Sequence, residues 1–357
     1  MSAPASPAQA TDPTDPGQVP ALRRAPLSRK LLMALVLLAL LVLACAASLA
    51  IGVREVSLPT VWDALWHPVA GNNDISVVRE QRVPRTLVGA LAGAALAVSG
   101  ALLQGLTRNP IADPGLLGVN AGSSLAVIVA ITVFGLGDLD AFVWFAYAGA
   151  AIAAALVYGV ASTGWEGATP VRLALVGAAA TAMMTSLITL VLLTSREALE
   201  QYRFWSVGSL NARGVGTVLL VLAPLVVGMV AALSATRFLN ATALGDDLAR
   251  GLGQNIAVGR TLVIVGAVLL AGSATALAGP VAFVGLMVPH AVRALIGPDY
   301  RWVVPLSALG GPVLLLLADV VGRVLVRPSE LEAGIVVAVL GAPALIALVR
   351  RSKAVSM

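Results

Sequence analysis

The 357-residue chain has little charge, two histidines and one cysteine. Charged residues make up 11% of it and hydrophobic residues 59%. A soluble domain carries about 25% charged residues, so most of this chain cannot face water. The single cysteine, Cys45, excludes a disulfide framework. Neither His67 nor His290 has a nearby Cys or second His with which to build a zinc site. We therefore expect no metal site, and iron, if it is carried, would stay inside a chelator.

Lysine is equally scarce, and this bears on whether the chain itself could bind a nucleotide as a source of energy. A P-loop has the pattern G-x-x-x-x-G-K-[ST], in which the lysine reaches the terminal phosphates of a nucleotide. The only lysines are Lys30, which follows Arg29, and Lys353, which follows Ser352. We expect the chain to be no enzyme and to bind no cofactor itself, with ATP and Mg on a partner ATPase. A membrane-embedded enzyme would need clustered acids, His or Cys, and the sequence offers no such cluster.

What the sequence does contain is a series of long apolar runs. About 20 helical residues cross the roughly 30 Å of hydrocarbon in a bilayer, whereas a β-barrel would show short alternating segments. The expected fold class is therefore all-α, a polytopic membrane protein of about ten transmembrane helices within 31–350. The expected spans are 31–52, 86–106, 116–135, 141–161, 171–193, 215–235, 260–279, 281–296, 303–325 and 333–350.

Both ends of the chain are expected in the cytoplasm, with the spans in the inner membrane. More of the 23 Lys and Arg residues fall on the side of the termini than on the other, as the positive-inside rule requires of a cytoplasmic side. Residues 1–30 are expected to form a disordered cytoplasmic tail, and 351–357 a second tail. The net charge of +5 comes from arginines that punctuate the spans, so we expect lipid contact and no nucleic-acid partner.

The first apolar run also has an alternative interpretation. Basic residues followed by an apolar run and the small residues Ala44–Ala47 fit a cleaved signal peptide. However, the run is longer than a signal peptide needs, and further apolar runs follow it. We therefore expect an uncleaved first span.

Two segments break the helical pattern near the membrane. One is Arg108–Gly115, which contains two prolines, and the other contains Gly279 and Pro280, followed by Pro289 and His290. Proline breaks helices, and broken backbone at membrane depth persists only when protein buries it or when it lines a water-filled cavity. Both segments are candidates for a transport pathway. The alternative is that these residues only end helices at the membrane interface.

One acid is expected inside a span. Arg323 follows Asp319 by four residues, the spacing of an ion pair on one helix face. Ion-coupled transporters place acids or histidines within their spans, so a self-sufficient ion-coupled transporter is the alternative function class. A single paired acid gives it little support.

The longest loop on the expected cytoplasmic side, 236–259, contains the pattern of a short helix. Asp246 and Asp247 suit its first turn, Arg250 its last turn, and Gly251 or Gly253 its C-terminal cap. We expect an exposed helix that lies across the cytoplasmic face. The alternative is a solvated connector.

Five segments together resemble one family, the membrane permeases of ABC importers for iron-siderophores, haem and vitamin B12. They are Arg82–Leu87, Asn109–Gly118, Leu244–Gly253, Gly279–His290 and Leu340–Pro343. Each alone is a weak signal, but their order makes the set specific. The resemblance implies the type II importer architecture, with ten helices per subunit and two subunits around one pathway. The implied partners are a second permease (identical or a paralogue), two cytoplasmic ATP-binding subunits and an external substrate-binding protein.

The resemblance also implies roles for individual residues. The segment that would insert into a groove on the ATPase comprises Leu244, Gly245, Asp246, Asp247, Ala249, Arg250, Leu252 and Gly253. The arginines implied to meet acidic groups of the binding protein are Arg82, Arg85 and Arg323, for which anchoring at lipid headgroups is the alternative. The residues implied to narrow the cytoplasmic exit are Asn109, Ile111, Thr169 and Pro170, although Pro170 stands where the family commonly has a hydroxyl.

Within the family, a ferric siderophore is the expected cargo. Gly- and Ala-rich spans with few charges suit a large chelate that slides past a weakly binding surface. The stretch Tyr202–Leu210 is more similar to siderophore permeases than to the vitamin B12 branch. The alternatives are haem and cobalamin. The expected function is thus the membrane passage of a ferric siderophore, driven by ATP hydrolysis on a separate subunit.

Overall fold

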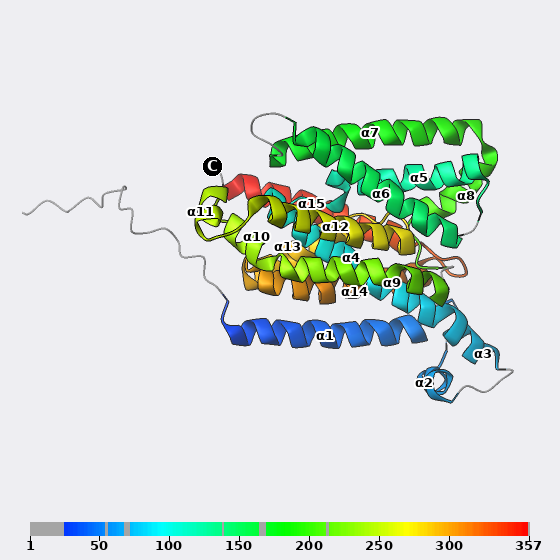
Figure 1. Cartoon of the computed structure of the whole chain (residues 1–357). Helices are drawn as coiled ribbons and strands as arrows, with labels where there is room; N and C mark the ends of the chain where they lie inside the picture. Colours follow the sequence, from blue (N-terminus) through cyan, green and yellow to red (C-terminus); the bar gives the residue numbers. More distant parts are fainter. Residues whose placement is uncertain are drawn as a thin grey trace, which may run out of the picture.

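A computed structural model describes residues 25–53, 56–67, 72–137, 139–163, 169–211 and 214–355 of the chain. Most of the expected N-terminal tail lies outside these ranges. Within them the chain is helical and has no β-strand, and the long helices lie side by side with roughly parallel axes (Figure 1).

The elements follow one another along the chain as helices joined by short connections. They are α1 (Leu27–Ala50), α2 (Leu58–Trp66), α3 (Asn73–Ser76), the π-helix η1 (Val77–Arg82), α4 (Val83–Thr107), the 3-10 helix η2 (Pro114–Leu117), α5 (Val119–Phe134), α6 (Leu139–Ala161), α7 (Pro170–Thr194), α8 (Arg196–Ser206), α9 (Val215–Ser234), α10 (Thr236–Thr242), α11 (Asp246–Gly251), α12 (Ile256–Ala278), α13 (Val284–Ile296), α14 (Tyr300–Leu325) and α15 (Ala333–Val355).

Among the described residues, ten of these helices correspond to the expected spans. Seven are long and apolar enough to cross a membrane, namely α1, α4, α6, α7, α9, α12 and α14, and the shorter apolar helices are α5, α13 and the part of α15 up to Ile346. Most ends agree with the expected spans to within about four residues. The expected all-α membrane fold is confirmed. α15 continues to Val355, so most of the expected C-terminal tail is helical.

The segment before α4 differs from the loop expected there. α2 is capped by Ser57, whose Oγ accepts a hydrogen bond from the Thr60 N–H at 3.3 Å. α3 and η1 then run into α4 as one continuous helix from Asn73 to Thr107. Hydrophobic runs alone do not predict this extension, because Arg79 and Glu80 interrupt them.

Close contacts between glycines hold the centre of the bundle together. α4 is buried along most of its length and packs against α12, α13 and α14. Gly93 lies against the backbone of Gly311, and Gly100 lies against the backbone of Gly285. Because lipid supplies little hydrophobic drive for helix association, small residues that let backbones approach closely are the usual means of packing in membranes.

The bundle has two distinct ends. α10, α11 and the loop after α4 lie at one end, here named the α11 end, together with the start of α1 and the end of α15 (Figure 1). α2, α3 and α8 lie at the opposite end, here named the α8 end.

Candidate functional site

α11 forms a short helix with the expected end residues. Gly245 precedes it with φ +108°, a conformation that favours glycine. Asp246 and Asp247 occupy its first turn and Arg250 its last turn, which suits the helix dipole. Gly253, rather than Gly251, takes the positive φ after it, at +78°. The prediction of a short helix in this loop is confirmed.

Three exposed leucines, here named the leucine stripe, lie within α11 and immediately before and after it. Leu244, Leu248 and Leu252 recur every four residues and are exposed by 63%, 60% and 62%, whereas Ala249 on the opposite face is fully buried. An exposed apolar patch rimmed by polar groups marks an interaction surface. Sequence reasoning does not single out Leu248, although its four-residue spacing from the other two leucines is a visible signal.

The two acids of α11 point in different directions. Asp246 is ion-paired with Arg108 at the end of α4, and its second oxygen lies 2.5 Å from Arg260 Nη2 in α12. Asp247 is fully exposed and pairs with Arg250 one turn along the same helix, at 2.7 Å. Asp246 thus faces the bundle, and Asp247 faces away from it.

Local hydrogen bonds shape the loop that contains Asn109 and Ile111. Arg108 ends α4 in the left-handed conformation, with φ 52°. The Ile111 N–H donates to Asn109 Oδ1 at 3.1 Å, and the Gly115 N–H donates to Asp113 Oδ1 at 2.8 Å. Desolvation raises the pKa of the Asp113 carboxyl, against the lowering effect of that hydrogen bond.

Gln104 ties this loop to two other elements. Its buried side chain donates to the carbonyl oxygens of Ala112 at 3.2 Å and of Gly285, at the start of α13, at 3.1 Å. Arg293 of α13 donates to the Gln104 side-chain oxygen. No sequence motif pointed to Gln104, because its four partners, Leu286 included, are distant in the chain or part of the backbone.

The second expected gate segment lies at the start of α7. Thr169 caps this helix, with its hydroxyl oxygen accepting from the Arg172 N–H at 3.4 Å, and Pro170 is its first residue. η2, which follows the loop after α4, packs against α7. The role of both expected gate segments in gating stays a prediction.

Between α12 and α13 the backbone leaves the helical path for residues 279–283. Gly279 has φ +74° and Phe283 has φ +68°, which is why α13 starts at Val284 rather than at the expected 281. Gly279 packs against the Trp205 carbonyl, and Phe283 packs against Gly341 of α15. The break is partly buried, because Gly279 and Val281 are buried whereas Ala282 is exposed, so protein covers only part of the irregular backbone.

α13 carries the remaining two residues of this predicted segment. Pro289 is buried, and His290 is half-buried. Among the described residues, His290 Nδ1 has no hydrogen-bond partner. The role of Gly279, Pro280, Pro289 and His290 in a pathway stays a prediction.

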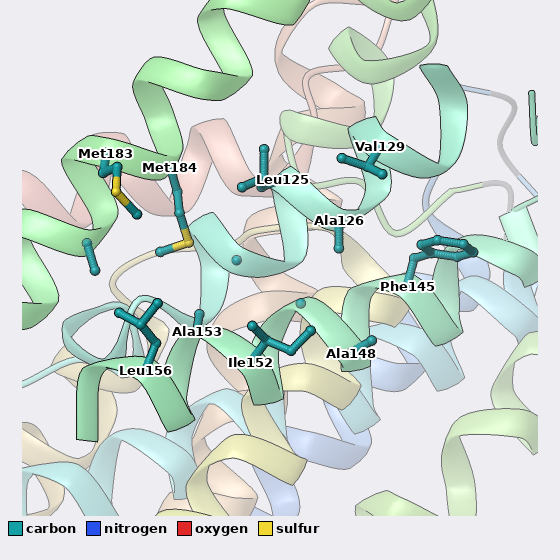
Figure 2. Close-up of a pocket in the computed structure, with 13 residues that line it drawn as sticks. Leu125, Ala126, Val129, Phe145, Ala148, Ile152, Ala153, Leu156, Met183 and Met184 are labelled. Carbon is teal, nitrogen blue, oxygen red and sulfur yellow. The ribbon is translucent and has the colours of Figure 1, made fainter. Parts of the chain in front are cut away.

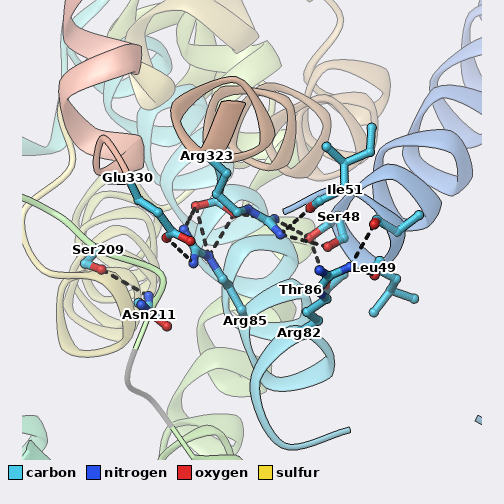
Figure 3. Close-up of polar contacts among 12 residues, drawn as sticks. Ser48, Leu49, Ile51, Arg82, Arg85, Thr86, Ser209, Asn211, Arg323 and Glu330 are labelled. Carbon is cyan, nitrogen blue, oxygen red and sulfur yellow. Dashed lines mark hydrogen bonds and ion pairs between the residues drawn. The ribbon is translucent and has the colours of Figure 1, made fainter. Parts of the chain in front are cut away.

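The three arginines expected at the external surface are instead buried at the α8 end. Arg82, Arg85 and Arg323 are exposed by 6%, 6% and 2%. Asp319 accepts from Arg85 Nη2 at 2.8 Å and from Arg323 Nη2 at 2.6 Å, and Glu330 accepts from Arg85 Nη1 at 2.7 Å (Figure 3). The expected ion pair between Asp319 and Arg323 is confirmed, and it is part of a larger network.

Two of these arginines also cap the end of α1. Arg82 Nη1 donates to the Leu49 carbonyl at 2.6 Å, and Arg323 Nη1 donates to the carbonyls of Ser48 and Ile51 at 2.9 Å (Figure 3). A helix C-terminus has unpaired carbonyls and a partial negative charge, which cations satisfy. Anchoring at lipid headgroups is thus wrong for these side chains. Their docking role stays a prediction, and the three side chains line a cavity of about 190 Å³ beside Glu330.

A larger cavity lies between α5, α6 and α7. It measures about 410 Å³, and its lining includes Leu125, Phe145, Ile152, Met183 and Met184 (Figure 2). The residues that line it are all apolar, so it offers no group for acid–base chemistry. A surface of this kind suits weak contact with apolar groups.

Comparison with known proteins shows the family to which this chain belongs. Residues 40–351 match the FecCD transport family. The chain belongs to this family. It is a permease subunit of an ABC importer, a multi-pass membrane protein whose ATPase is a separate subunit. The alternatives of an ion-coupled transporter and of a membrane-embedded enzyme are set aside.

Several relatives of this FecCD permease align along nearly their whole length. The ferric enterobactin transport system permease protein FepD of Escherichia coli is 44% identical over 315 residues, which are 88% of this chain and 94% of the relative. The hemin transport system permease protein HmuU of Yersinia pestis is 35% identical, with coverage of 89% and 95%. A solved metal-chelate type ABC transporter in an inward-facing conformation matches with a TM-score of 0.75 at 30% identity and covers 89% of this chain and 98% of that one.

Proposed function

We propose that this FecCD permease imports a ferric siderophore of the enterobactin class. The observation that carries the proposal is the 44% identity to a ferric enterobactin permease, against 35% to a hemin permease. Permeases named for iron(3+)-hydroxamate and Fe(3+)-citrate are 38% and 37% identical, so the scaffold accommodates several iron chelates. Haem and cobalamin are the alternatives.

Uptake of labelled chelates tests the cargo. Cells that lack this chain are given radio-iron in enterobactin, in a hydroxamate chelate, in citrate and in haem, together with labelled cobalamin. We expect uptake of ferric enterobactin to fall by about tenfold or more and to return with the chain supplied from a plasmid. Loss of haem or cobalamin uptake with unchanged ferric enterobactin uptake would contradict the proposal.

We further propose that α11 receives the movement of the ATP-binding subunits. Its exposed leucine stripe supplies apolar area, and Asp247 and Arg250 supply polar groups at the rim, which together resemble a small protein interface. On this proposal the α11 end is cytoplasmic, and both termini are cytoplasmic with it. ATP-driven closure would push on α11, while the permease itself contributes geometry and no bond chemistry.

The other partners follow from the same orientation. A second permease, identical or a paralogue, would cover the outward apolar face of α7, on which Leu175, Leu190 and Leu193 are exposed. An external binding protein would dock at the α8 end, where its acidic groups would reach the cavity beside Arg82, Arg85 and Arg323. A docked binding protein would release the chelate directly above the bundle.

Replacing Leu248 by Asp tests the role of α11. A charge at the centre of an apolar contact should reduce retention of the ATP-binding subunits during purification by about tenfold or more. The control is Leu58→Asp, because Leu58 is 65% exposed but lies at the α8 end. Quantitative immunoblotting of the purified complex measures the effect. Equal retention in both variants would contradict an ATPase contact on α11.

A further inference from the structure

Glycines in open space flank α11 on both sides. Gly245 and Gly253 have positive φ, and a Cβ added to either would meet no heavy atom within 4 Å. Glycine without packing partners gives the backbone wide freedom. The backbone connections alone would therefore let α11 tilt without moving the helices beside it.

The side chain of Asp246 connects α11 to two other helices. Each of its two carboxylate oxygens is paired with a guanidinium group from a different helix, one from Arg108 and one from Arg260. All three side chains are partly exposed, and such pairs contribute little to stability. These pairs are of interest because they join α11 to two other helices, and not because they stabilise the fold.

The Arg108 contact leads to the loop after α4. Arg108 is the C-cap of α4, and its N–H donates to the Gly105 carbonyl. Asn109 and Ile111, which are joined by their own hydrogen bond, follow it directly. A displacement of Arg108 therefore displaces this loop.

The Arg260 contact leads to α12. Arg260 lies in the second turn of this helix, which packs against α4 and α9 and ends at the backbone break that starts at Gly279. One carboxylate thus connects α11 to the helix that ends at the loop after α4 and to the helix that ends at the backbone break between α12 and α13.

We propose that Asp246 is a positioning residue that transmits the tilt of α11 to the loop after α4 and to α12. The inference rests on the proposed role of α11 and divides that short helix between two tasks. The leucine stripe and Asp247 face the ATP-binding subunits, whereas Asp246 faces the permease. Asp246 is then needed for the response to ATP but not for holding the ATP-binding subunits.

The test measures movement of the loop without any cargo. The importer complex is purified with Cys45→Ala and Ile111→Cys in this chain, because Ile111 is 40% exposed and its replacement offers a thiol to a maleimide dye. The labelling rate is compared between the nucleotide-free complex and the complex trapped with ATP and vanadate. We expect trapping to change the rate by about tenfold, and Asp246→Asn to reduce this change to less than about twofold. ATP hydrolysis and retention of the ATP-binding subunits should stay at the level of the parent complex.

Matched variants separate this role from the others. Asp247→Asn, one residue away and facing outward, should keep the full change in labelling rate, and Arg108→Gln should lose it as Asp246→Asn does. Inverting the charges with Asp246→Arg, Arg108→Glu and Arg260→Glu together should restore the change.

Three results would overturn the inference: a full labelling change with Asp246→Asn, no change in the parent complex, or loss of the ATP-binding subunits with Asp246→Asn. Failure of the proposed function would show separately, as retention of those subunits by Leu248→Asp.

Discussion

Replacing Asp319 by alanine is expected to destabilise the protein by about 3–5 kcal/mol, the cost of leaving buried charges without their partner. Asp319 is fully buried and accepts hydrogen bonds from both Arg85 and Arg323. Its removal leaves Arg323, which is 2% exposed, without the carboxylate that it pairs with, and leaves Arg85 with Glu330 in place of two acids. Because these arginines join α1, α4 and α14, the loss should loosen all three helices at the α8 end. Chemical unfolding of the purified protein in mild detergent measures the change.

Glu330→Gln is the matched control for this prediction. Glu330 also accepts from Arg85, but its side chain is 29% exposed, and the amide oxygen of glutamine can still accept the hydrogen bond. We expect a cost of less than about 1 kcal/mol, as for other ion pairs at a protein surface. If Asp319→Ala were no more destabilising than Glu330→Gln, the network would not hold these helices together.

The second large effect is expected for Gly100→Ala, with a loss of about 3 kcal/mol, the upper part of the range for overpacked interiors. A Cβ at this position would lie 1.9 Å from the Gly285 carbonyl oxygen. Backbone atoms cannot rotate away as a side chain can, so α4 and α13 must separate. The same displacement would disturb the hydrogen bond from Gln104 to Gly285. We therefore expect chelate uptake to fall together with stability.

Gly159→Ala serves as the control for that substitution. Gly159 lies within α6, and a Cβ there would meet no heavy atom within 4 Å. Alanine is favoured over glycine in a helix by up to about 1 kcal/mol, so this variant should be as stable as the parent or slightly more stable. Unfolding curves and uptake are measured for both variants. Equal stability of the two would contradict the close approach of α4 and α13.

Features set by local periodicity could be predicted from the sequence. Apolar runs of span length gave the ten membrane helices, because burial in lipid acts on each helix separately. The pair Asp319 and Arg323 followed from a spacing of four residues on one helix. The short helix α11 followed from acids at one end, Arg250 at the other and glycines beside it. Each of these depends on residues close together in the chain.

Features that depend on distant parts of the chain could not be predicted in this way. Arg85 and Asp319 are 234 positions apart, and no spacing rule brings them together. Arg82 and Arg85 were expected at the surface because they lie between two expected spans, and Arg323 because it lies near the end of its span. The two directions taken by Asp246 and Asp247 depend on where α4 and α12 lie relative to α11.

The capping of α1 by Arg323 has a consequence for biosynthesis. Ser48 and Arg323 are separated by 275 positions, so the carbonyl groups of Ser48 and Ile51 meet this donor only after α14 has been synthesised, whereas Arg82 is available to the Leu49 carbonyl much earlier. The contacts of α1 with α14 thus form late, since chains are synthesised from the N-terminus and distant contacts form late. Until α14 is inserted, the carbonyl groups of Ser48 and Ile51 lack the guanidinium group of Arg323.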